Sequence, residues 1–194
     1  MLIGLTGGIG SGKSTIAQQL RSMGYAVYDT DKEAKRLIIE NGQVRAQMEQ
    51  VFGKEVYANN VYQTSIVAQR VFADSTLLSQ LNAIVHPAVK ADILRWKEAF
   101  SPTSMCFVEC AILYQAGFDT LCDKVIAVTA PEEIRLERAV IRDHSTADKV
   151  RARMRAQESE KYLQLADLVV NNDGKTEIIA ICLQIQDFFR NFAG

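Results

Sequence analysis

The chain has few of the side chains that bind metals or form cross-links. Its 194 residues include only two histidines and four cysteines, and no two cysteines form a CxxC pair. Cys106 and Cys110 fall in one predicted strand, where four residues span about 13 Å, too far for a disulfide or a shared metal. A zinc site would therefore need ligands from distant parts of the chain. We expect four reduced cysteines that pack as small apolar residues.

The chain also lacks a dominant charge and any long apolar run. Twenty-two Lys and Arg balance 23 Asp and Glu, which leaves a net charge of −1. This balance excludes a molecule-wide attraction to nucleic acid or to a membrane surface. No apolar run approaches the roughly 20 residues of a membrane span, and residues 2–5 lack the basic start of a secretion signal. We expect a cytoplasmic protein without nucleic-acid or membrane partners, and a monomer that self-associates weakly at most.

Internal repeats and Pro- or Gly-rich linkers are absent, and 48% of the residues are hydrophobic. One principal domain with a small appended lobe is therefore expected. Five short apolar runs are typical of strands buried on both faces. They cover residues 2–6, 26–28, 105–108, 125–129 and 168–170. Helical patterns lie between them, for example at residues 14–23 and 176–189. Strands that alternate with helices predict an α/β fold with a mostly parallel five-stranded sheet covered on both faces.

The middle of the chain breaks this alternation. From Lys32 to Phe100 helical patterns dominate, and the only strand signal is a short hairpin expected around Asn59-Asn60. The long helical run from Ser75 to Phe100 is expected to be interrupted at His86-Pro87, because the residue before a proline is biased away from helical geometry. We predict a helical lobe inserted into the sheet domain.

A glycine-rich segment follows the first predicted strand. Residues 4–15 read GLTGGIGSGKST, and Gly7 with Gly12-Lys13-Ser14 matches GxxxxGK[ST] between a strand and a helix, as this motif requires. Glycines let successive N–H groups approach phosphate oxygens, and the helix N-terminus adds its positive dipole end. Lys13 is expected to reach the terminal phosphates, and the Ser14 hydroxyl to ligate Mg²⁺. The spacing does not fit the dinucleotide motif GxGxxG, so the segment predicts a site for a nucleoside triphosphate.

Two carboxylates follow the second predicted strand, in the sequence Tyr28-Asp29-Thr30-Asp31. Open α/β sheets bind their ligands at the carboxyl ends of the strands. Either aspartate could hold Mg²⁺ through water or accept a proton from an attacking hydroxyl. The alternative is that an aspartate only caps the next predicted helix, over residues 32–39.

A third group of residues is basic. Three arginines follow Pro131 at spacings of three and four, which predicts one stripe on a helix: Arg135, Arg138 and Arg142. A stripe of this kind is often only a solvated face. Beside a phosphate site, however, an arginine-bearing helical hairpin can close over the triphosphate and neutralise the transferring group. Ser145-Thr146 would be its tip, between helices predicted over residues 134–143 and 147–161.

The motif alone does not separate a kinase from a nucleotide-dependent switch. A GTPase would usually carry Asn-Lys-x-Asp, and the nearest segment, residues 171–174, lacks the lysine. Two alternatives remain open. One is a kinase for a nucleoside monophosphate or another small alcohol, which would differ in the lobe at 32–100. The other is a non-enzymatic switch, which would turn over nucleotide slowly and would bind a partner protein differently with ATP and with ADP.

Together these segments resemble the dephospho-coenzyme A kinases, over residues 3 to about 174. The glycine-rich segment at residues 4–15, which is a phosphate-binding loop (P-loop), is similar to that family's P-loop. The segment Asp29-Thr30-Asp31 with Ala34 is similar to the family's Asp-x-Asp-x-x-Ala-Arg segment. Further similarity lies in His86-Pro87, in Glu109-Cys110-Ala111-Ile112-Leu113-Tyr114, in Glu137-Arg138 through Arg142-Asp143, and in Ala156-Gln157 through Ala166-Asp167 to Asn172. The chain departs from the family pattern with Lys35 for Arg, Glu109 for Asp, Ala111 for Pro and Gln115 for Glu. Between Gln157 and Ala166 it is also one residue shorter than the usual spacing and lacks the arginine found there.

The resemblance implies a P-loop NTPase three-layer sandwich that transfers the γ-phosphoryl group of ATP to the ribose 3′-hydroxyl of dephospho-coenzyme A. It implies a core at residues 1–31, 101–130 and 163–194, a substrate lobe at 32–100 and a lid at 131–162. Asp31 is then the candidate base, with Mg²⁺ held by Ser14 and through water by Asp31, and Arg138 or Arg142 stabilises the transferring group. The implied nucleotide contacts are Gly8, Gly10, Ser11, Gly12, Lys13, Ser14, Thr15 and Asn172. The implied acceptor contacts are Asp31, Lys35, His86, Ile112 and Leu113.

Overall fold

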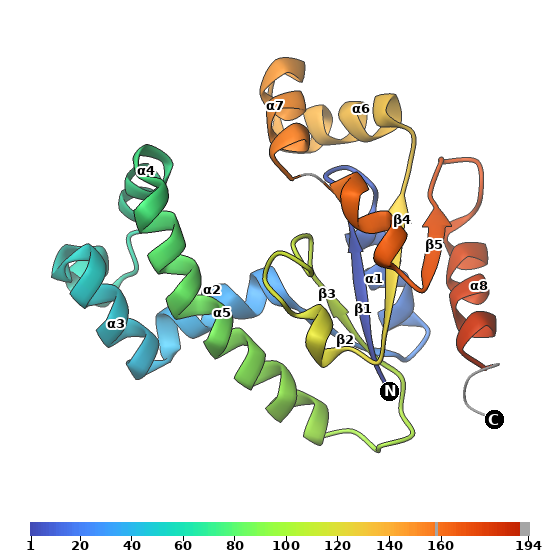
Figure 1. Cartoon of the computed structure of the whole chain (residues 1–194), viewed down its shortest axis with the longest axis horizontal. Coiled ribbons are helices and arrows are strands. Elements are labelled where there is room, and N and C mark those ends of the chain that lie inside the picture. The colour runs from blue at the N-terminus through green and yellow to red at the C-terminus, as the bar shows by residue number, and fades with distance from the viewer. Residues whose placement is uncertain (158, 191–194) are drawn as a thin grey trace. The chain divides into compact units, whose positions relative to one another are not determined.

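A five-stranded sheet lies in the first of two compact units, which comprises Met1–Tyr28 and the chain from Ser101 onward (Figure 1). The computed structural model describes residues 1–157 and 159–190. The strand order is β2-β3-β1-β4-β5, and the pairings of β1 with β3, β1 with β4 and β4 with β5 are parallel. The strands are β1 (Leu2–Gly7), β2 (Ala26–Asp29), β3 (Cys106–Glu109), β4 (Lys124–Thr129) and β5 (Leu168–Asn171). The predicted α/β class and all five predicted strands are confirmed.

Two helices cover one face of this sheet. They are α1 (Lys13–Ser22) and α8 (Ile178–Arg190), whose apolar side chains form one buried cluster with Ile3 and Leu5 of β1. Side chains alternate between the two faces of a strand, so Gly4 points to the opposite face. There a Cβ on residue 4 would lie 2.7 Å from the Leu113 side chain. The glycine therefore lets the loop after β3 pack directly on the central strand.

A pair of helices connects β4 to the last strand. Helix α6 (Glu132–Asp143) ends at His144, whose φ of 46° is left-handed, and α7 (Ala147–Gln157) starts three residues later. The predicted turn at Ser145-Thr146 is confirmed. The predicted helix over 147–161 is wrong in its length, because a separate 3₁₀ segment, η3 (Ser159–Leu165), follows α7. Residue 158 of that prediction lies outside the described residues. A short 3₁₀ turn, η2 (Asp119–Leu121), precedes β4.

The second unit, Asp29–Phe100, is helical. Its elements are α2 (Thr30–Glu40), α3 (Gly42–Phe52), η1 (Lys54–Asn60), α4 (Thr64–Ala73) and α5 (Ser75–Glu98). The hairpin predicted at Asn59-Asn60 is wrong. Both asparagines have a positive φ, as in a hairpin turn, but they end a 3₁₀ segment.

The interruption predicted at His86-Pro87 is also wrong, because α5 runs through Pro87 as one element. Proline removes one backbone hydrogen bond from a helix. Here the buried side chains of Val85, Val89 and Ile93 on both sides of Pro87 compensate, since each contributes to the core of the lobe.

None of the four cysteines, which all lie in the described ranges, takes part in a disulfide. Within the same ranges, no helix combines the length and the apolar character that a bilayer span requires.

Candidate functional site

The P-loop forms a tight backbone turn between β1 and α1. The N–H of Ser11 donates to the carbonyl of Gly8 at 3.1 Å, and Gly12 is the N-cap of α1, with φ 88°. At Gly10, φ is 77° and an added Cβ would lie 2.1 Å from the carbonyl oxygen of Arg135. A side chain at either glycine would therefore be strained and, at Gly10, would also clash with α6. The sequence requires glycine here because the backbone itself forms the site.

The polar side chains of this turn fit an anion. Ser11 is fully buried, and in the described structure its Oγ has no hydrogen-bond partner. The Nζ of Lys13 lies over the same turn and donates to the carbonyl of Gly8 at 3.3 Å. Ser14 and Thr15 are exposed in the first turn of α1, at the positive end of the helix dipole. A buried hydroxyl, an ammonium group and a helix N-terminus together can bind phosphate oxygens.

Asn172 supports the P-loop from the far end of the chain. It directly follows β5 and is buried, and its Nδ2 donates to the carbonyl of Ser11 at 2.8 Å. An added Cβ on Gly12 would lie 2.1 Å from this Nδ2. The side chain predicted to contact the nucleotide thus holds the backbone that forms the phosphate site.

The three arginines of α6 have different environments. Arg138 is half-buried, and its Nη1 donates to the carbonyl of Asn172 at 2.9 Å, which places the guanidinium beside the P-loop. Arg135 is only 5% exposed, and its Nε donates to the carbonyl of Ile9 at 3.1 Å. The alternative of a solvated face therefore does not hold for Arg135, because its side chain is buried against the P-loop.

Arg142 is exposed and lies at the end of α6. It donates two hydrogen bonds to Asp143, at 2.7 and 3.2 Å, and Arg153 donates a third at 2.6 Å. These hydrogen bonds, first from Arg142 and then from Arg153, hold the pKa of Asp143 well below its usual range. The Asp143 carboxylate thus keeps Arg142 and Arg153 together where α6 and α7 meet.

A small cleft opens beside the P-loop at the carboxyl ends of β1 and β4. The rings of Tyr114 and Tyr162 stack at its edge, with centroids 5.2 Å apart. Burial, helped by the carboxylates of Asp119 and Asp167, raises the pKa of Tyr114 to about 12. Sequence analysis did not identify this ring pair, since residues 114 and 162 belong to segments far apart in the chain. The lining residues are Thr6, Gly7, Ala111, Tyr114, Gln115, Ala127, Tyr162 and Leu163.

The two acceptor residues predicted in the loop after β3 differ in exposure. Ile112 is 38% exposed, whereas Leu113 is fully buried against Gly4. Ile112 can offer apolar surface to a ligand. The Leu113 side chain packs in the core of the first unit and offers none in this conformation.

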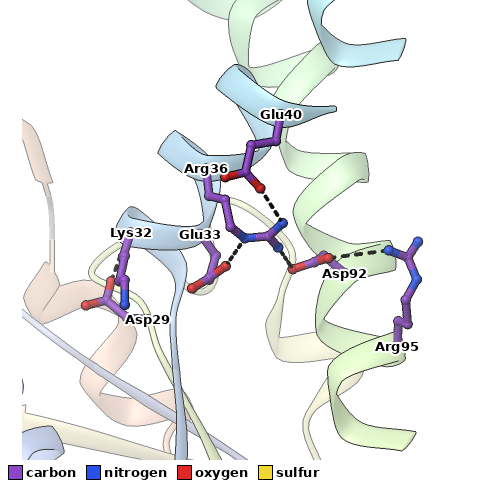
Figure 2. Close-up of polar contacts among 7 residues, drawn as sticks. All are labelled: Asp29, Lys32, Glu33, Arg36, Glu40, Asp92 and Arg95. Carbon is purple, nitrogen blue, oxygen red and sulfur yellow. Dashed lines mark hydrogen bonds and ion pairs between the residues drawn. The ribbon is translucent and has the colours of Figure 1, made fainter. Parts of the chain in front are cut away.

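The two aspartates at the end of β2 and the start of α2 have different environments within the second unit. The Asp29 side chain caps α2, because its Oδ1 accepts a hydrogen bond from the N–H of Lys32 at 3.0 Å (Figure 2). Asp31 lies in the first turn of the same helix and is exposed, as is Lys35 one turn later. The capping alternative therefore holds for Asp29, while Asp31 has its carboxylate accessible.

Helix α2 is fixed to α5 by a network of ion pairs around Arg36 (Figure 2). Its Nη2 donates to Asp92 of α5 at 2.7 Å, and its Nε donates to Glu33. The carboxylate of Glu33 raises the pKa of Arg36 above its ordinary value; partial burial opposes this shift, and Asp92 adds to it. Arg95 lies at the edge, 3.5 Å from Asp92. The nearly buried carboxylate of Asp92 therefore holds α2, the helix that carries Asp31 and Lys35, against α5.

We expect Asp92→Ala to lower the free energy of unfolding by about 1–2 kcal/mol, because it leaves Arg36 without its partner on α5. For a chain of this size the melting temperature should fall by roughly 2–8 °C. Thermal unfolding followed by circular dichroism measures this. Arg95→Ala is the matched control, since Arg95 is exposed and should change stability by less than about 0.5 kcal/mol. Equal effects of the two substitutions would contradict the assigned role of Asp92.

His86 lies inside α5 and is half-buried. Burial, together with the charge of Lys90, lowers the pKa of its imidazole. The ring is therefore neutral at physiological pH, which allows it to accept or donate a neutral hydrogen bond. In the described ranges, no group of three or more His, Cys, Asp or Glu side chains could hold a metal ion.

The chain is similar to a protein family, to curated relatives and to solved structures. A model of the dephospho-CoA kinase family matches residues 1–177. A dephospho-CoA kinase of Porphyromonas gingivalis is 43% identical over 164 residues, which cover 84% of this chain and 81% of the relative. One from Bacteroides fragilis is 36% identical over 187 residues, which cover 96% and 91% of the two chains. A crystal structure of a Thermus thermophilus protein matches with a TM-score of 0.83 and 32% identity, over 96% of this chain and 95% of the other.

Proposed function

The chain belongs to the dephospho-CoA kinase family, and from this premise we propose that it transfers the γ-phosphoryl group of ATP to the ribose 3′-hydroxyl of dephospho-coenzyme A, the last step of coenzyme A synthesis. The observation that carries the proposal is the joint arrangement of the P-loop, Arg138 and Asn172. The backbone turn, the buried Ser11 hydroxyl and the Lys13 ammonium fit a triphosphate. Arg138 adds a cation beside that turn.

The residues have distinct proposed roles. Lys13 binds the β- and γ-phosphates, and Asp31 orients the acceptor hydroxyl and takes its proton. Arg138 stabilises the charge on the transferring group, because its guanidinium lies next to Gly12. Arg142, farther along α6 and paired with Asp143, is assigned to the closed state of the helical pair. Lys35, His86 and Ile112 are the proposed acceptor contacts.

Mg²⁺ is part of the proposal. Ser14 at the start of α1 would hold it directly, and Asp31 would hold it through water. The exposed Ser14 hydroxyl fits this role, because Mg²⁺ keeps several waters and is usually bound by one or two side chains together with phosphates. When bound, Mg²⁺ neutralises charge on the phosphates. A monomeric enzyme in the cytoplasm, where ATP is made and consumed, completes the proposal.

The first test is a coupled assay of ADP release with MgATP and dephospho-coenzyme A, with mass spectrometry of the product. We expect turnover and a product heavier by one phosphoryl group. Adenosine, AMP, CMP and shikimate serve as competing acceptors, and each should give much lower kcat/KM, because only the full acceptor can use the binding energy of its remote groups. Preferred turnover of another acceptor would overturn the proposed substrate and leave a kinase of different specificity.

A further inference from the structure

The tip of the P-loop is attached at three points to the helices α6 and α7. The Ile9 side chain packs against the small buried cluster of Ala139, Val150 and Met154 from these helices. The Ile9 carbonyl accepts a hydrogen bond from Arg135 of α6 at 3.1 Å. The Ile9 N–H donates to Oε1 of Gln157, the last residue of α7, at 2.8 Å. The P-loop tip is therefore packed against the helical pair and hydrogen-bonded to both of its helices.

Gln157 extends this connection to the loop after β3. Its side-chain Nε2 donates to the backbone carbonyl of Ala111 at 2.9 Å. The backbone carbonyl of Gln157 accepts a hydrogen bond from Nε2 of Gln115, also at 2.9 Å. An N–H can only donate and a carbonyl can only accept, so Ile9 and Ala111 together fix the orientation of the Gln157 amide. One side chain thus joins the P-loop, the end of α7 and the loop that carries Ile112.

We propose that Gln157 is a positioning residue that couples the nucleotide side of the site to the acceptor side; this inference rests on the proposed function. The amide holds the P-loop tip at Ile9 to the turn at Ala111, which lines the cleft. Phosphoryl transfer needs the donor and the acceptor held at near-attack distance, so a loose connection between the two loops reduces catalysis. Glutamate and methionine, which have a similar length, cannot both accept from Ile9 and donate to Ala111 at neutral pH.

Two substitutions of Gln157 distinguish its hydrogen bond to Ile9 from its hydrogen bond to Ala111. Gln157→Met removes both hydrogen bonds at similar side-chain length, and we expect KM to rise about tenfold for ATP and for the acceptor. Gln157→Glu, assayed in mildly alkaline buffer, keeps an acceptor for Ile9 but cannot donate to Ala111. It should raise KM for dephospho-coenzyme A and leave KM for ATP within about twofold of wild type. This split between the two KM values is not expected from a general loss of folding.

Gln115→Glu tests the outer bond, because a carboxylate cannot donate to the Gln157 carbonyl. The bond is exposed, so we expect only a rise of about two- to threefold in KM for the acceptor. Gln18→Met is the matched control: Gln18 is exposed on α1, and the substitution should change neither KM.

The outcomes distinguish this inference from the proposed function. Unchanged KM values in Gln157→Met, or equal changes in both KM values in Gln157→Glu, would overturn the coupling role. If wild type does not turn over dephospho-coenzyme A, the proposed function fails. The connection is then tested by titration of each variant with a fluorescent ATP analogue. Weaker nucleotide binding in Gln157→Met than in Gln157→Glu would still support the attachment of the P-loop tip, and equal binding would contradict it. If Gln157→Met does not fold, Gln157→Glu and Gln115→Glu supply the same comparison.

Discussion

Lys13→Ala is expected to lower kcat with dephospho-coenzyme A by at least about 100-fold, because it removes the mobile cation that balances charge on the transferring phosphoryl group. In the structure the Lys13 ammonium already lies over the P-loop, 3.3 Å from the carbonyl of Gly8. Little reorganisation is needed when the phosphates arrive, so the loss should appear mainly in kcat, with a smaller rise in KM for ATP. Steady-state kinetics of the coupled reaction measures both parameters.

The control for this prediction is Lys54→Ala, which removes an exposed lysine at the start of η1. Circular dichroism should show the same helix content for wild type and both variants. A kcat for Lys13→Ala within about tenfold of wild type would be incompatible with a transition-state role for the ammonium group.

Asp31→Asn is expected to lower kcat by about 10²–10⁴-fold, since an amide of the same shape cannot take the proton of the acceptor hydroxyl. Binding of ATP should change little, because Ser14 is proposed to hold Mg²⁺ directly and Asp31 to hold it only through water. The exposed position of Asp31 in the first turn of α2 makes a large loss of stability unexpected. Single-turnover measurements with saturating substrates report the chemical step directly.

Asp29→Asn is the matched comparison two residues earlier. Asp29 caps α2 by accepting from the N–H of Lys32, and asparagine caps helices about as well as aspartate. Its kcat should therefore stay close to wild type. If Asp29→Asn were as damaging as Asp31→Asn, the chemistry would have to be reassigned to the pair of carboxylates, or to Asp29 itself.

Local pattern was sufficient to predict the sheet. Each strand is a short apolar run, and a run of this kind must be buried whatever its neighbours are. The P-loop was equally predictable, because its glycines at positions 10 and 12 meet a local backbone requirement that the structure shows as positive φ. Where local signals conflict with packing, the prediction fails. Pro87 was expected to interrupt a helix, but burial of Val85 and Val89 on either side outweighs the one lost hydrogen bond.

The side chains that contact the P-loop could not be predicted from the sequence. Arg135 has the spacing of a surface stripe, yet it is buried against Ile9, a residue 126 positions away. Gln157 belongs to a segment similar to the family, but its bonds to Ile9 and Ala111 join parts separated by 148 and 46 positions. Periodicity describes which face of a helix is polar. It does not describe what that face meets.

The fold class and the phosphate-binding turn could be predicted from short-range spacing: apolar runs, glycines that permit one backbone turn, and a lysine and a serine at fixed offsets. The family followed from the resemblance of several segments over residues 3 to about 174. Which polar side chains support the turn depends instead on long-range packing. Ser11, Asn172, Arg135 and Gln157 come together only when strands and helices far apart in the chain pack side by side. Their hydrogen bonds exist because a buried backbone group must find a partner, and the nearest partner is set by packing and not by position in the sequence.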